Sequence, residues 1–103
     1  MELDQIRYFL ALCEELNVAR AAERCDVAPS SLTRAIAALE AEFGGALFHR
    51  EHANMRLSRL GQKVKPFLEQ TDSHVEGARR KADDFVRQQG QSGAKSRSSS
   101  RPP

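Results

Sequence analysis

The residue types best suited to chemistry lie on the second of two short helices that the sequence predicts between Val18 and Gly45. Ser30, Thr33 and Arg34 share the outer face of this helix near its N-terminal end, because apolar residues at helical spacing occupy the other face. An arginine there can donate two hydrogen bonds to guanine, and a threonine offers base edges a hydroxyl and a methyl group. The pattern is typical of a helix-turn-helix whose second helix reads double-stranded DNA.

An ordinary helical hairpin is the alternative interpretation, with Arg34 as a solvated surface residue and the serines as helix caps. The residues that follow favour DNA recognition. After a Gly-Gly helix stop at residues 44–45, two short strands are predicted over 46–50 and 55–57, joined by a polar turn at 51–54. Two strands behind such a helix make a winged helix.

The first predicted helix, residues 3–16, has an apolar stripe wide enough to pack against both the helix-turn-helix and a further helix. Ser58 is a suitable N-cap for that further helix. Along it, apolar or small residues recur mostly every 3.5 residues, at Leu60, Val64, Leu68, Thr71, Val75, Ala78, Ala82 and Phe85. This period predicts a coiled-coil seam and a homodimer. The alternative, a helix folded back on its own domain, needs a wider stripe with a period nearer 3.6.

Three segments resemble the LysR-type transcriptional regulators of bacteria, and together they run from Met1 to about Gln70. They read MELDQIRYFLAL, ARAAERCDVAPSSLTRAIAALEAEFGGALFHR and RLSRLGQKVKPFLEQ. The resemblance implies a winged helix-turn-helix, a dimer formed through a long linker helix, and sequence-specific operator binding. It places the base-reading positions on Pro29, Ser30, Thr33 and Arg34.

Three positions depart from the family pattern. Ala28 stands where a Ser or Thr usually caps the DNA-reading helix, and the missing cap costs about 1 kcal/mol. Pro29 replaces a Gln that offers a base contact, although proline suits the first turn of a helix. Glu51 puts an acidic side chain in the wing, where it repels phosphates.

The formal net charge of +2 is unevenly distributed. Residues 1–57 contain nine acidic side chains and six arginines, whereas residues 58–90 contain seven basic and five acidic side chains. Bulk attraction to DNA is therefore weak, and binding depends on local placement of cations. We expect one face to gather Arg20, Arg34, Arg50, Arg56 and Lys63. Ser31 and His52 complete the expected contacts to the DNA backbone.

No residues have the spacing of a catalytic or metal site. There is no nucleophile beside a base and no glycine-rich phosphate loop, so we expect neither catalysis nor a cofactor. His49, His52 and His74 lack ligand spacing with the cysteines. Cys13 and Cys25 are expected to be buried, small apolar residues rather than a disulfide or a redox pair. We find no signal peptide and no apolar run of about 18 residues, which predicts a cytoplasmic protein without membrane contact.

The predicted fold class is mainly α, with a winged helix-turn-helix of three helices and a two-stranded wing over residues 1–57. A linker and dimerisation helix follows over 58–89, and residues 90–103 are expected to be a disordered, basic, Ser-rich tail. The predicted function is that of a dimeric DNA-binding regulator without an effector-binding domain or small-molecule effector site. The alternative is a truncated interaction module that forms a heterodimer with a full-length relative and modulates its DNA binding.

Overall fold

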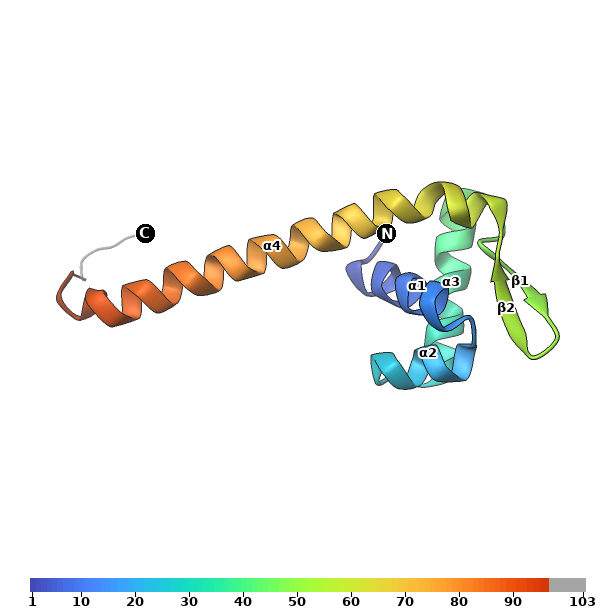
Figure 1. Ribbon diagram of the computed structural model, residues 1–103, viewed down its shortest axis with the longest axis horizontal. Coiled ribbons are helices and arrows are strands. Elements are labelled where there is room, and N and C mark those ends of the chain that lie inside the picture. Colours follow the sequence, from blue (N-terminus) through green and yellow to red (C-terminus); the bar gives the residue numbers. More distant parts are fainter. Residues whose placement is uncertain (97–103) are drawn as a thin grey trace. The chain divides into compact units, whose positions relative to one another are not determined.

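The computed structural model describes residues 1–96, and it describes side chains up to residue 90. The elements follow the order α1 (Leu3–Glu15), α2 (Val18–Cys25), α3 (Pro29–Phe43), β1 (Phe48–Glu51), β2 (Asn54–Leu57) and α4 (Arg59–Ser96) (Figure 1). The chain divides into two compact units, of which the first is Met1–Asp72 and the second begins at Ser73. The predicted fold class, mainly α with a two-stranded wing and a long last helix, is confirmed.

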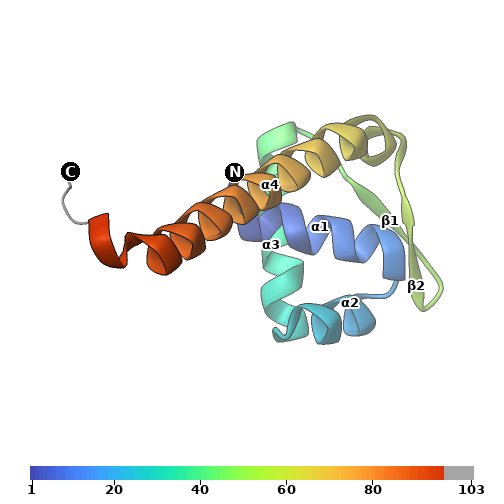
Figure 2. The ribbon, with the colours of Figure 1, turned by 60° about the vertical axis from the view of Figure 1, so that its left-hand side comes forward.

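Helices α1, α2 and α3 pack against one another and form the core of the first unit (Figure 2). The largest fully buried side chains are Phe9, Leu12, Leu32, Leu39 and Leu47. The buried residues of α2 are Ala21 and Ala22, whose small side chains allow α2 to cross α3 closely. Phe9 is fully buried, and its ring centroid lies 5.5 Å from that of Phe48 in the wing. The core thus joins the helices to the wing.

Helix α3 buries one stripe, which consists of Leu32, Ile36 and Leu39. A helix completes a turn every 3.6 residues, so Thr33 and Arg34, one and two residues after Leu32, must point away from this stripe. Thr33 and Arg34 are accordingly exposed. The apolar pattern therefore decides which side chains α3 presents to a ligand.

The two ends of α3 agree with the sequence interpretation. Ala28 is the N-cap residue, with extended backbone at φ −69° and ψ 146° and no side-chain cap, and Pro29 occupies the first turn. At the other end, Gly44 takes the left-handed conformation at φ 83°, and its N–H donates to the Glu40 carbonyl at 2.8 Å. Glycine tolerates this conformation best, which explains why the helix stops there.

The wing is an antiparallel hairpin in which Phe48 pairs with Leu57 and Arg50 pairs with Met55. Its strand ends lie within two residues of the predicted ones, and a two-residue turn joins the strands. His52, in that turn, takes a left-handed φ of 59°. Because alternate residues of a strand point to opposite faces, Phe48, Arg50 and Met55 share the face that meets the core.

Ser58 closes the junction between the wing and α4. Its N–H donates to the Leu47 carbonyl at 2.9 Å, its hydroxyl donates to the Ala46 carbonyl at 2.7 Å, and its oxygen accepts from the Gly61 N–H at 2.9 Å. The last of these bonds is the predicted N-cap of α4. Gly61 is needed beside it, since a Cβ there would lie 2.5 Å from the Leu47 carbonyl oxygen.

The first turns of α4 belong to the core of the first unit. Leu68 is buried, and Leu60 and Val64 pack against the same cluster. The expected partner of the wide α1 stripe is thus this part of α4, and Arg7 Nε lies 3.3 Å from Asp72 Oδ1 across the same contact. Leu68 is enclosed by the chain's own core, which corrects its place in the predicted dimer seam, whereas Leu60 and Val64 are only half-buried there and their part in a seam stays a prediction. Over so few turns, periods of 3.5 and 3.6 differ too little to separate a seam from a core stripe.

Helix α4 continues to Ser96 instead of ending at Gln89, and it accommodates Pro66 in its interior. Extending a formed helix adds a backbone hydrogen bond per residue without a new nucleus, which composition alone does not take into account. The rest of the predicted tail, residues 97–103, lies outside the described residues.

The missing cap of α3 gives a first prediction. Replacing Ala28 with Ser or Thr supplies an oxygen to the free N–H groups of the first turn and should raise the free energy of unfolding by roughly 0.5 to 1 kcal/mol. Thermal and urea unfolding measure the change. The control is Ala41→Ser at an exposed interior position of the same helix, where serine should lower stability by about 0.5 kcal/mol. A loss of stability in both variants would show that position 28 does not act as a cap.

Candidate nucleic-acid interface

The outer face of α3 presents the residues that were expected to read bases. Pro29, Ser30, Thr33 and Arg34 are exposed, and Ser31 is half-buried. The Thr33 hydroxyl donates to the Pro29 carbonyl at 2.9 Å, which leaves its methyl group and the acceptor side of its oxygen unused. Among the described residues, nothing forms an ion pair or a hydrogen bond with the Arg34 side chain. Its guanidinium is therefore available to a ligand.

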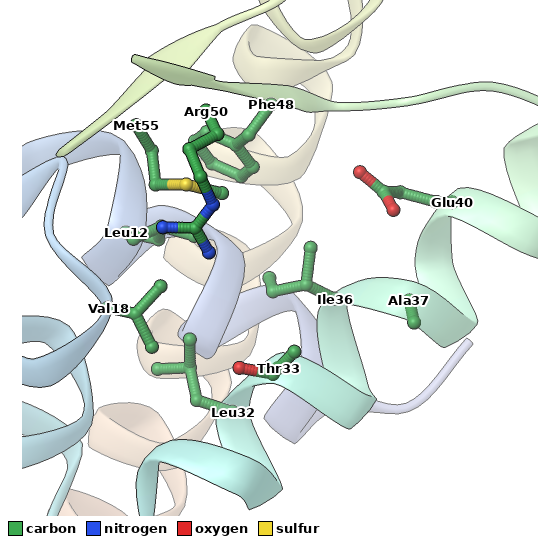
Figure 3. Close-up of a pocket in the computed structure, with 10 residues that line it drawn as sticks. All are labelled: Leu12, Val18, Leu32, Thr33, Ile36, Ala37, Glu40, Phe48, Arg50 and Met55. Carbon is green, nitrogen blue, oxygen red and sulfur yellow. The ribbon is translucent and has the colours of Figure 1, made fainter. Parts of the chain in front are cut away.

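A groove of about 280 Å³ lies between α3 and the wing (Figure 3). Thr33 and Ala37 line it from α3, and Arg50 and Met55 line it from the wing. The Arg50 side chain extends from the wing into this groove (Figure 3). Glu40 also lines the groove, and its carboxylate accepts the Leu47 N–H at 2.8 Å, so it holds the turn that follows α3. The structure thus brings Arg50 to the same groove as Thr33.

The two wing arginines do not share a face, which corrects the expectation that all the cations gather on one side. Arg50 pairs with Met55 and lies on the groove side, whereas Arg56 pairs with His49 and points the other way. Arg56 Nε lies 4.0 Å from Glu51 Oε1 on that second face. Both side chains of this ion pair are about 60% exposed, so the pair contributes little to stability. Glu51 nevertheless offsets the positive charge of Arg56 in the wing.

The remaining expected backbone contacts come from separate elements. Arg20 is exposed on α2, His52 is exposed in the wing turn, and Lys63 is exposed on α4. In the part of the chain that the structure describes, they form no ion pairs. All three are therefore free to meet an anion.

Phe67 on α4 is 70% exposed, although the predicted seam does not include it. The predicted seam used its neighbour Leu68, which is buried. The sequence contains a second repeat that includes Phe67. Phe67, Thr71, His74 and Ala78 follow one another at spacings of four, three and four, which places them along one face of the helix. Phe85, which the seam did include, is 61% exposed, and the adjacent Val86 is 66% exposed.

The two thiols are free and half-buried. Burial raises the pKa of Cys13 from 9.0 to about 12, despite the opposing effect of Lys65. Burial also raises the pKa of Cys25. Neither thiol is activated as a nucleophile, since that requires a lowered pKa.

Within the described residues, no group of His, Cys, Asp and Glu side chains is arranged to hold a metal ion. The helices there are also not long and apolar enough for any of them to cross a membrane.

The comparisons with known proteins agree with this geometry. Residues 3–62 match the family described as bacterial regulatory helix-turn-helix protein, lysR family. The chain is 43% identical over 61 residues to the HTH-type transcriptional regulator ClcR of Pseudomonas putida, covering 59% of this chain and 21% of that protein. It is 39% identical over 83 residues to the regulator TcbR of Pseudomonas sp. (strain P51), covering 81% of this chain and 27% of that protein.

Two similar solved structures are complexes with DNA. The DNA-binding domain of BenM with benA site 1 DNA has a TM-score of 0.75 at 28% identity, covering 82% of this chain and 99% of that chain. The DNA-binding domain of CbnR with DNA has a TM-score of 0.67 at 37% identity, covering 84% of this chain and 95% of that chain.

The fold and the exposed α3 face define a winged helix-turn-helix domain of the DNA-binding class. The chain belongs to the LysR family of bacterial regulatory helix-turn-helix proteins. It spans only 21% of the length of ClcR and 27% of that of TcbR.

The thiol chemistry gives a second prediction. At pH 8, iodoacetamide should alkylate Cys13 in the Cys25→Ala variant about tenfold more slowly, or slower still, than it alkylates Cys25 in the Cys13→Ala variant, because only the thiolate reacts. Below pH 9 the thiol is neutral in the folded and the unfolded chain, so its raised pKa costs no stability there, and the free energy of unfolding should fall as the pH rises from 9 towards 12. Mass spectrometry of timed samples measures the rates, with urea-unfolded protein as the control. Equal rates in the folded variants would contradict the burial of Cys13.

Proposed function

We propose that this chain is a sequence-specific, DNA-binding transcriptional regulator that binds operator DNA as a dimer. The observation that carries the proposal is the exposed, unpaired Arg34 beside Thr33 on the helix that the BenM and CbnR domains share with this chain. Such a protein acts on DNA in the cytoplasm, without catalysis and without a cofactor.

In this proposal, α3 enters the major groove with its N-terminal half. Arg34 donates two hydrogen bonds to O6 and N7 of a guanine, and Thr33 places its methyl group against a thymine. Pro29 and Ser30 complete the base-reading set at the start of the helix. The free N–H groups of this first turn suit a phosphate.

The wing and the neighbouring helices hold the DNA backbone. Arg50 acts from the groove side of the wing, and Arg20, Ser31, His52, Arg56 and Lys63 supply the other contacts. Since residues 1–57 are acidic in total, affinity depends on these placed groups and falls steeply with salt. We propose residues 1–57 as the DNA-binding domain and α4 as the linker helix, although the first turns of that helix also complete the core.

The dimer forms through the part of α4 that the core leaves uncovered. The apolar and small positions available for a seam are Thr71, Val75, Ala78, Ala82 and Phe85. Their spacing of about 3.5 residues lets two helices pack side by side. Leu68 takes no part, because the core of the first unit encloses it, and the same core partly covers Leu60 and Val64.

The second candidate function is an interaction module that pairs through α4 with a full-length relative and weakens the DNA binding of that relative. The exposed apolar residues Phe67, Phe85 and Val86 favour it, since such side chains on one helix are typical of a protein interface. Glu51 in the wing favours it too, because an acidic residue opposes phosphate contacts.

A third prediction tests base reading. Arg34→Ala should lower affinity by about 1 to 3 kcal/mol and relax the preference at one base pair per half-site, because a bidentate contact is lost. Arg50→Ala should instead weaken binding to all sequences alike and reduce the slope of log affinity against log salt by about 0.9. Titrations on the operator and its single-base variants, at several salt concentrations, separate the two effects. Unchanged base preference in Arg34→Ala would exclude it as a reader and favour the interaction module.

A fourth prediction concerns the dimer. The double variant Val75→Glu, Phe85→Glu places like charges opposite one another in the seam and should give a folded monomer that binds the operator far more weakly. The control Arg80→Glu puts a carboxylate on the opposite face of α4 and should leave the dimer intact. The dimer should place half-sites about 10 to 10.5 base pairs apart, or a multiple of that. Sedimentation and footprinting measure both properties, and a double variant that stays dimeric would rule out this seam.

A further inference from the structure

The corner between α1 and α2 is hydrogen-bonded to β2 of the wing. Figures 1 and 2 both show the α1–α2 connection beside β2. The Met55 N–H donates to the Leu16 carbonyl at 2.8 Å, and the Asn17 Nδ2 donates to Asn54 Oδ1 at 3.2 Å. One backbone bond and one side-chain bond therefore join the corner to two consecutive residues of β2.

Asn17 has a second bond that ties the wing to the helix-turn-helix. Its Oδ1 accepts the Arg20 N–H at 2.9 Å and so caps α2, while its Nδ2 reaches Asn54. A single side chain thus links the first turn of α2 to the first residue of β2. The preceding residue, Leu16, holds a left-handed φ of 55°, a conformation that branched side chains adopt rarely and only where the surroundings support it.

The part of β2 that the corner holds lies opposite Arg50, the wing arginine on the groove side. Met55, which the corner holds by its N–H, is the register partner of Arg50. Met55, Arg50 and Val18, the residue after Asn17, line the same groove (Figure 3). The hairpin has only two strands, so the corner supplies the outer edge of β2 with a bond that a third strand would otherwise provide.

We propose that Asn17 is a positioning residue for the wing, and that it acts on DNA binding through Arg50. It does not touch DNA itself. Its link to Asn54 holds the hairpin at one distance from α3, and thereby keeps the Arg50 side chain in the groove that Thr33 also lines. The effect on DNA rests on the proposed function, whereas the effect on the wing does not.

Two variants separate the link from the helix cap. Asn17→Ser keeps an oxygen that can accept the Arg20 N–H, but its side chain is too short to reach Asn54. Asn54→Ala removes the other partner at an exposed position and leaves every helix unchanged. Gln70→Ala, which removes an exposed amide on α4, is the control.

Native-state amide exchange tests the link without DNA. In Asn17→Ser and in Asn54→Ala, the Met55 amide should exchange about three- to tenfold faster than in the wild type, the change expected for one lost hydrogen bond. The Arg20 amide should stay protected in Asn17→Ser, and Gln70→Ala should change neither amide. The double variant should exchange no faster than either single variant. Unchanged exchange at Met55 overturns the proposal.

Affinity measurements test the action through Arg50. Asn17→Ser should weaken binding about three- to tenfold on all sequences alike, lower the salt slope, and leave base preference unchanged. In an Arg50→Ala background the same substitution should cost less than twofold, because the contact that it positions is already absent. If Asn17→Ser still weakens binding about three- to tenfold in the Arg50→Ala background, Asn17 does not act through Arg50. A wild-type protein that selects no DNA sequence refutes the proposed function and with it the action through Arg50, and the exchange measurement then decides the wing link alone.

Discussion

The burial of one stripe on α3 is the constraint on which the rest of the structure depends. Leu32, Ile36 and Leu39 are enclosed by the core, so this helix cannot rotate about its axis without exposing apolar surface or burying polar side chains. Moving the stripe by one residue turns the helix by about 100° and would bury Thr33. At roughly 1.5–3 kcal/mol for each apolar side chain, that rotation is excluded for a domain of this size. The chemistry that α3 presents is therefore a consequence of what it buries.

The wing takes its place from the same core. Phe48 packs on Phe9, and Ser58 joins the end of the hairpin to the start of α4 with hydrogen bonds on both sides. Strand alternation then decides that Arg50 enters the groove beside α3, while Arg56 meets Glu51 on the other face. Because side chains alternate along a strand, a basic residue of the hairpin reaches the α3 side only if it lies an even number of residues from Phe48 in β1 or from Met55 in β2.

Local patterns predicted much of this structure, because they act within one element. The α3 stripe, the missing cap at Ala28 and the Ser58 cap all depend on residues within a turn of one another. Contacts between elements could not be predicted from such local patterns. The spacing of Leu60, Val64 and Leu68 fits either a partner helix or the chain's own core, and only packing decides between them. Likewise, nothing in the spacing of Asn17 and Asn54 indicates that their side chains meet.

The central claim is that the α3 face reads a specific DNA sequence. Selection of bound duplexes from a random pool by the purified chain, followed by sequencing, tests it most directly. We expect an enriched motif with two related half-sites, separated by about one helical turn or a multiple of it. A pool that stays random in sequence, with binding that depends only on salt, would contradict the account and leave α4 as the functional surface of the chain.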